Sequence, residues 1–317
     1  MRDSKMWKGK GLTVDIVKLP EGPFPVATPD WEQVKADLRE FGYGIAKGVL
    51  SPEEVRTMRA ILTREIEKDE QAGKIKESYT DRDAVNRRLS VLSDRHPVFR
   101  DLAEHPFALE MAAEILGPSY LNETFLLHGL SANVTRPGSS DMGIHGDTDF
   151  IRPYINAPLF ARMIYFLDDF DEEVGATRVV PKSHIWGHLP LKDGSVKYES
   201  LPALGPAGSV LVYDGRLYHG TGANRSKDRE RAGVIAGYVH SWMRPLVPFP
   251  MILDPKVMEG ASERCRQLLG YGTVNMGFDL PWTQAPEEIA ALTVGQKREI
   301  TDMRREVRQD TPQQPAS

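Results

Sequence analysis

The chain has 317 residues, of which 40% are hydrophobic and 27% charged, a composition typical of a globular protein with one large domain or two modest ones. Its net charge of −5, with both signs interspersed, argues against a nucleic-acid or anionic-membrane surface and favours a small-molecule partner. A single cysteine, Cys265, excludes an internal disulfide framework. No apolar stretch is long enough to span a membrane, and the charged amino-terminal run lacks the apolar core of a signal peptide, so we expect a cytoplasmic protein.

The first part of the chain, about 28–118, predicts helices that pack outside a core. Apolar residues at helical spacing after Pro29 predict a helix over 28–41, and Gly42 ends it. Ser51-Pro52-Glu53-Glu54 is a capping box that begins a second helix. A third is predicted over 106–116.

The segment 69–88 is polar and charged, which predicts a mobile loop. It ends in Arg87 and Arg88, for which two interpretations are open. Either these side chains are solvated surface charge, or one of them reaches into a pocket to meet an acidic substrate or cosubstrate. Lys76 is open to the same two interpretations.

From about 122 to 245 the pattern changes to short extended runs separated by Gly and Pro. The predicted strands are Phe125 to Thr135, Leu159 to Leu167, Thr177 to Val180, Ser209 to Tyr213, Arg216 to Thr221 and Ala232 to Trp242. Such a series predicts a sandwich or barrel with the helices packed outside it, an α+β fold with a β core. The connection 187–208 has no strong pattern. A helical extension over about 255–308 and a disordered tail, 309–317, complete what we interpret as one domain over 1–317.

The stretch Ile144-His145-Gly146-Asp147 carries the first chemical signal. In an extended segment His145 and Asp147 project from the same face, so an imidazole and a carboxylate can share a metal ion. His219, which follows an apolar strand and a turn, is the natural third ligand. Two imidazoles and one carboxylate on one face of an octahedron are the ligand set of non-heme Fe(II) oxygenases. Zn(II) can occupy the same residues, but no general base for a zinc hydrolase is evident.

A candidate anion site follows the third ligand. Strand alternation places Arg231 on one face with two glycines, Gly233 and Gly237, and a guanidinium there can bind a carboxylate at two points. Arg229 shares that parity. We prefer Arg231 because it lies further into the strand.

These motifs together resemble one family. His145-Gly146-Asp147, the run from Gly175-Ala176-Thr177 to Pro181-Lys182-Ser183-His184, and His219-Gly220-Thr221-Gly222 followed by Arg231 are similar to the phytanoyl-CoA dioxygenase (PhyH-like) family of Fe(II)/2-oxoglutarate-dependent oxygenases. The resemblance covers roughly 30–245 and implies a double-stranded β-helix, or jelly roll. It further implies that the His145, Asp147 and His219 triad binds Fe(II) and that Arg231 binds the distal carboxylate of 2-oxoglutarate.

The resemblance implies one further contact, and the chain departs from the family pattern at two positions. The resemblance implies a hydroxyl contact from Thr177 to the cosubstrate. Lys182 stands where the family usually has glycine. Met142 or Gly143 stands where relatives often carry an amide side chain.

The expected activity is therefore consumption of O2 and 2-oxoglutarate, release of succinate and CO2, and oxidation, by default hydroxylation, of an unactivated C–H bond of a small molecule. Desaturation, ring formation and endoperoxide formation stay open, whereas halogenation is disfavoured because Asp147 fills the position that a halide needs. Two rivals stay open, a divalent-metal hydrolase on a related barrel and a non-catalytic small-molecule-binding barrel.

The substrate and the assembly state are less constrained by the sequence. We expect substrate contacts from pocket-wall residues and a monomer or homodimer. The candidate contacts are Arg88, Asp149, Phe150 and Trp242.

Overall fold

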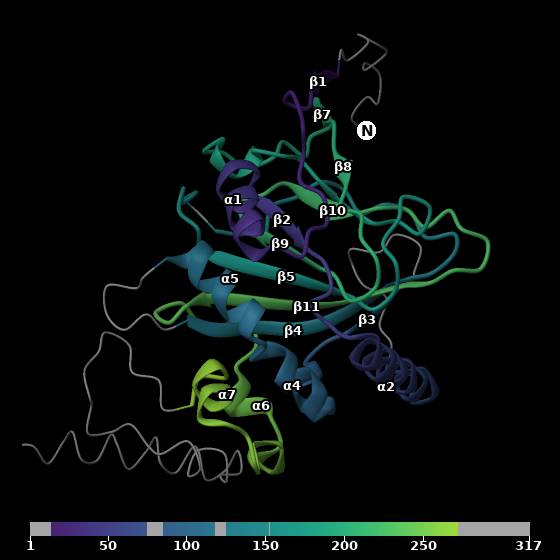
Figure 1. The fold of residues 1–317 in the computed structure, drawn as a ribbon, viewed down its shortest axis with the longest axis vertical. Helices are drawn as coiled ribbons and strands as arrows, with labels where there is room; N and C mark the ends of the chain where they lie inside the picture. The colour runs from purple at the N-terminus through teal and green to yellow at the C-terminus, as the bar shows by residue number, and fades with distance from the viewer. Residues whose placement is uncertain (1–13, 75–84, 118–124, 152, 272–317) are drawn as a thin grey trace, which may run out of the picture.

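The computed structural model describes residues 14–74, 85–117, 125–151 and 153–271 (Figure 1). Its centre is a six-stranded antiparallel sheet with strand order β2-β9-β5-β11-β4-β3. The bounds are β2 Tyr43–Ala46, β9 Val210–Asp214, β5 Phe160–Phe166, β11 Arg231–His240, β4 Phe125–Thr135 and β3 Arg87–Leu89. A smaller antiparallel sheet has the order β10-β6-β8. Its bounds are β10 His219–Thr221, β6 Thr177–Val179 and β8 Leu201–Pro202. The two sheets form the expected double-stranded β-helix.

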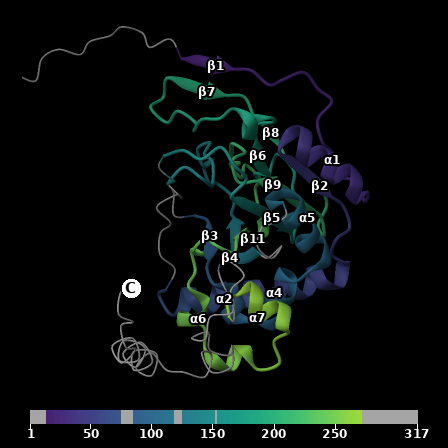
Figure 2. The same cartoon turned by 90° about the vertical axis from the view of Figure 1, so that its left-hand side faces the viewer.

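An apolar cluster joins the two sheets. Ile164 and Leu211 of the large sheet and Val179 of the small one belong to it, and all three are buried. A third element, the parallel pair of β1 (Asp15–Val17) with β7 (Val196–Tyr198), lies at the opposite end of the molecule from the carboxy-terminal helices (Figure 2).

Helices cover the other face of the large sheet and bury its second set of side chains. They are α1 Trp31–Phe41, α2 Pro52–Gln71, α3 Leu92–Arg95, α4 Pro97–Ala103, α5 Pro106–Leu116, α6 Phe249–Ile252 and α7 Glu263–Leu268. A 3-10 turn follows β6 at Ser183–Ile185, and another lies at Pro255–Met258. Tyr165 and Tyr238, both fully buried on that face, donate hydroxyl hydrogen bonds to the carbonyls of Leu102 (3.1 Å) and Ala103 (2.8 Å). These bonds link the carboxy-terminal end of α4 to the sheet. Within the described ranges, no helix is long and apolar enough to cross a membrane.

Most predicted elements are present, with local differences that have physical reasons. The capping box at Ser51 and Glu54 is formed as predicted. The first helix begins at Trp31 rather than Pro29, because the Asp30 side chain accepts the backbone N–H groups of Glu32 and Gln33 and so acts as the cap.

The segment expected to be a loop, 69–88, was predicted wrongly at both ends. Helix α2 continues to Gln71, and Arg87–Leu89 forms the edge strand β3 against β4. The short helices α3 and α4 and the strands β1, β7 and β8 were not predicted. The predicted helix and tail beyond residue 271, and Lys76, lie outside the described residues.

Candidate metal centre

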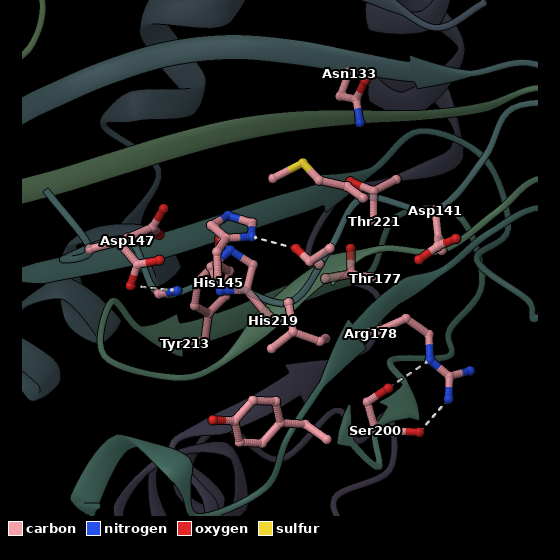
Figure 3. A pocket seen from close by; sticks show the side chains of 18 of the residues that line it. Asn133, Asp141, His145, Asp147, Thr177, Arg178, Ser200, Tyr213, His219 and Thr221 are labelled. Carbon is pink, nitrogen blue, oxygen red and sulfur yellow. Dashed lines mark hydrogen bonds between the residues drawn. The ribbon is translucent and has the colours of Figure 1, made fainter. Parts of the chain in front are cut away.

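The side chains of His145, Asp147 and His219 come together at one point between the two sheets (Figure 3). One potential ligand atom from each lies within 4.8 Å of the others. The two histidine segments are joined by a β-bridge, in which His145 N donates to His219 O at 2.9 Å and His219 N donates to His145 O at 2.8 Å. The third ligand, separated by a long stretch of sequence, is therefore a direct backbone neighbour of the first.

Hydrogen bonds orient both imidazole rings. Nδ1 of His145 donates to the Gly143 carbonyl at 3.1 Å, and Nδ1 of His219 donates to the Leu217 carbonyl at 2.9 Å. With Nδ1 protonated, Nε2 of each ring carries the lone pair, which is the usual arrangement of metal-binding histidines. The Tyr213 hydroxyl lies 3.3 Å from His219 Nε2. The donor set fits a divalent transition metal such as Fe(II).

Asp147 is held by Arg162, whose Nε donates to Oδ2 at 2.9 Å. Burial alone would raise the pKa of Asp147, but the Arg162 guanidinium and the neighbouring histidines lower it to about 2. Burial, followed by repulsion from His219, lowers the pKa of His145 to about 4. At neutral pH Asp147 is thus ionised and His145 neutral, the protonation states in which each can bind a metal.

A cavity of ≈ 1400 Å³ opens at the triad. Among the predicted residues, Thr177, Arg88, Asp149 and Phe150 line it together with the triad. Arg88 extends from the edge strand β3 opposite Asn133. This placement favours the interpretation that Arg88 enters a pocket over the one that it is surface charge.

Asp149 and Phe150 form part of the rim. Asp149 accepts the Gly146 N–H at 3.1 Å and forms a 2.5 Å ion pair with Lys192, which lies in the connection 187–208. Phe150 is 69% exposed. Trp242 stacks on His240 and is not among the described residues that line the cavity, so the structure does not support it as a pocket-wall residue.

The two candidate anion anchors differ sharply. Arg229 is on the surface, where it forms ion pairs with Asp171 at 2.6 Å and Glu173 at 2.5 Å. Arg231 is buried and is not among the described residues that line the cavity, and its Nη2 donates to the Gly175 carbonyl at 3.0 Å.

Within the described parts of the chain, Nε of Arg231 has no hydrogen-bond partner. Its guanidinium lies 4.5 Å from the Phe170 ring centroid. Burial lowers the pKa of Arg231 to about 9. Attraction to the Asp168 carboxylate opposes this shift, and repulsion from the Arg88 guanidinium adds to it. Two guanidinium groups that repel each other, one with an unpaired buried donor, are suited to an anionic ligand.

Sequence reasoning missed Arg162 and His128, both of which line the cavity. A signal for Arg162 was present, because it is the single charge within the apolar strand Phe160–Phe166 and a buried charge requires a partner. His128 had no such signal, since its position depends on an irregularity in strand pairing that no local pattern reveals.

Several known proteins are similar to this chain. The family model for phytanoyl-CoA dioxygenase (PhyH) matches residues 38–233. "Dioxygenase af480" of Aspergillus fumigatus is 30% identical over 244 residues, which cover 76% of this chain and 77% of the relative. "Dioxygenase cdmD" of Talaromyces verruculosus is 25% identical over 299 residues, 86% of this chain and 94% of the relative.

Among solved structures, the epimerase SnoN in complex with Fe3+, alpha ketoglutarate and nogalamycin RO matches with a TM-score of 0.53 and 23% identity, over 67% of this chain and 84% of that chain. AviO1 from Streptomyces viridochromogenes matches with a TM-score of 0.53 and 22% identity, over 69% of this chain and 99% of that chain. These two likenesses agree with the double-stranded β-helix.

Proposed function

Because this chain belongs to the phytanoyl-CoA dioxygenase family and is an Fe(II)/2-oxoglutarate-dependent dioxygenase, we propose that it hydroxylates an unactivated C–H bond of a small-molecule metabolite. The observation that carries the proposal is the convergence of His145, Asp147 and His219 on the wall of a cavity of ≈ 1400 Å³. When bound, Fe(II) couples the reduction of O2 to the oxidative decarboxylation of 2-oxoglutarate, which yields succinate and CO2.

We assign the ligands and the cosubstrate contacts as follows. The Nε2 atoms of His145 and His219 and the Asp147 carboxylate hold the metal. Arg231 neutralises one carboxylate of 2-oxoglutarate, supported by its unpaired buried Nε. Arg88 lies close enough to Arg231 to repel it, so an anion between the two would relieve the repulsion. The Thr177 hydroxyl, on the cavity wall, is a further candidate contact.

Hydroxylation is the simplest outcome that these residues support. One solved structure with this fold, SnoN, carries the name epimerase, so the fold alone does not determine the reaction. The cavity of ≈ 1400 Å³ has space for a substrate larger than 2-oxoglutarate alone.

The direct test is succinate formation from 2-oxoglutarate with Fe(II) under air, across a panel of small metabolites, with mass spectrometry for a gain of oxygen. The protein is expected to form succinate, and Asp147→Ala to form none. A hydrolase would act on its substrate without O2 and 2-oxoglutarate, and a binding barrel would retain the ligand unchanged. Either result would contradict the proposal. Undiminished metal binding by His219→Ala would overturn the ligand assignment.

A further inference from the structure

His128 reaches the cavity because strand β4 is irregular at this point. In the pairing of β4 with β11, Gly129 lies opposite Gly237 and Leu127 opposite Tyr238, so His128 has no opposite residue. Such a bulge inserts one extra residue and turns its side chain relative to the regular alternation. His128 therefore lines the cavity, while its neighbour Leu127 belongs to the core under the helices.

The bonding of the imidazole fixes its tautomer. Nδ1 of His128 accepts the backbone N–H of Leu246 at 3.1 Å, so the ring proton of the neutral form is on Nε2. The ring also packs edge-on against Phe160, with centroids 4.9 Å apart. Burial lowers the pKa of His128 to about 4, so the ring is neutral at physiological pH. In the part of the chain that the structure describes, the ring makes its hydrogen bond through Nδ1 and none through Nε2, which leaves an N–H donor on the cavity wall.

Arg162 approaches the same corner across a row of glycines. It lies opposite Gly237 in the pairing of β5 with β11, and Gly237 lies opposite Gly129 in β4. A side-chain carbon at Gly237 would be 2.2 Å from Arg162 Nη1, so the guanidinium occupies the space that glycine leaves free. It is close enough to His128 to lower the pKa of that ring.

The guanidinium has bonding capacity left. Nε holds Asp147, and no hydrogen bond of either Nη group is found among the described residues. Arg162 thus combines a fixed position beside the metal with free donors that face the cavity.

We propose that His128 Nε2 and the Nη groups of Arg162 form a subsite that binds an sp² oxygen of the organic substrate, in a ketone or a carboxylate. This inference rests on the proposed function. Both side chains are hydrogen-bond donors only in this arrangement, so the group they select is an acceptor. Because Arg162 also holds Asp147, an oxygen bound there fixes the substrate relative to the metal and selects which C–H bond lies beside it. Apolar walls of Phe150 and Leu246 next to this corner fit the carbon skeleton that carries the oxygen.

The test uses the full chain loaded with Mn(II) and 2-oxoglutarate, and three fluorinated probes of the same ring size. Para-fluoroacetophenone and para-fluorobenzoate carry the sp² oxygen, and para-fluorotoluene lacks it. Fluorine relaxation caused by Mn(II) reports binding beside the metal, with the Zn(II)-loaded protein as the diamagnetic control. The wild type is expected to bind at least one acceptor-bearing probe about 10-fold more tightly than para-fluorotoluene, as one net hydrogen bond of ~1.4 kcal/mol provides. The comparison of the two acceptor probes decides between ketone and carboxylate.

Two variants make the test specific. His128→Phe keeps the ring but removes the donor, and it is expected to reduce the preference for the acceptor probe by about 5- to 10-fold. Gly237→Ala keeps both donors but displaces the Arg162 guanidinium, and it is expected to reduce the preference as well. Arg178→Met is the control, because Arg178 lines the cavity yet is bonded to Ser200 and Glu172, and it should retain the preference.

Three results would overturn the subsite. The first is an equal affinity of the loaded wild type for all three probes, and the second is an unchanged preference for the acceptor probe in His128→Phe. The third is displacement of the acceptor probes by additional 2-oxoglutarate, because that would assign the two donors to the cosubstrate. A protein that fails to take up Mn(II) and 2-oxoglutarate fails at the loading step. That outcome defeats the proposed function itself and is distinguishable from a loaded protein without acceptor preference.

Discussion

His145 and His219 are backbone partners, joined by two hydrogen bonds of 2.9 and 2.8 Å, and their ring centroids lie 4.3 Å apart. The protein therefore brings the two imidazoles together through the backbone, and metal binding does not have to pay the full entropic cost of assembling them. Repulsion between the rings contributes to the lowered pKa of His145. The two histidines of the candidate metal centre are preorganised, and the residues that support the centre can be tested one at a time.

Arg231→Met is expected to weaken 2-oxoglutarate binding by about 30-fold or more, because removing one partner of a buried charge pair costs about 2 kcal/mol or more. The same variant should make the ligand-free protein more stable by about 1 kcal/mol, because a buried guanidinium with an unpaired Nε is replaced by an apolar chain. Calorimetry with 2-oxoglutarate and urea unfolding measure the two effects. Arg229→Met, on the surface, is the control and should show neither effect. A loss of 2-oxoglutarate affinity in Arg229→Met alone would reverse the assignment.

Arg162→Met is expected to reduce the affinity for Mn(II) by about 10- to 100-fold, the usual effect of removing a partner that orients a metal ligand. The cause is the loss of the 2.9 Å hydrogen bond to Asp147 Oδ2. Calorimetric titration with Mn(II) measures this affinity. Arg178→Met removes an arginine from the same cavity without touching the triad, and it should bind Mn(II) as the wild type does. Equal affinities in the two variants would contradict a positioning role for Arg162.

The stability of the metal-free protein should depend on pH through His128. Burial lowers the pKa of this ring in the folded state to about 4, below the ordinary value of 6.5. Between these two pH values the unfolded chain binds a proton at His128 that the folded chain does not bind. The contribution of His128 to the free energy of unfolding is therefore fully present above pH ~6.5 and is lost as the pH is lowered toward ~4. This group alone contributes a slope of up to about 1.4 kcal/mol per pH unit. Urea unfolding of the wild type and of His128→Phe across this range should show a shallower slope for the variant; parallel slopes would show that His128 titrates normally.

Lys182 occupies a backbone conformation that favours glycine, with φ of +65°, just before the 3-10 turn Ser183–Ile185. Lys182→Gly is therefore expected to be more stable than Lys182→Ala by about 1 kcal/mol. Both variants lose the 3.1 Å ion pair with Glu40 and the contact of Nζ with the Phe41 ring, so their difference isolates the backbone term. Chemical denaturation of the two variants gives this difference directly. Equal stabilities would mean that the local strain is relieved elsewhere.

The sequence predicted the elements whose signals are local. The capping box at Ser51 began a helix that the structure contains. Strand alternation predicted that His145 and Asp147 share a face, and their side chains do lie together, but His145 forms only an isolated bridge and Asp147 lies in a turn. Where a signal depended on pairing between distant segments, prediction failed. Arg87–Leu89 was interpreted as part of a loop because three polar or mixed residues carry no strand pattern, yet β4 provides hydrogen-bond partners that make them an edge strand.

The sequence by itself determined the ligand types, their order along the chain and the fold class, because each follows from residue identity, side-chain periodicity and an ordered series of motifs. Only the tertiary structure distinguished the exposed, ion-paired Arg229 from the buried Arg231, brought Arg162 to Asp147 and turned His128 into the cavity. The physical reason is strand register. Arg229 and Arg231 are two residues apart, so strand alternation gives them the same face, and only their neighbours in the folded chain differ. The glycine row that positions Arg162 and the bulge that positions His128 form only when β4, β11 and β5 are paired.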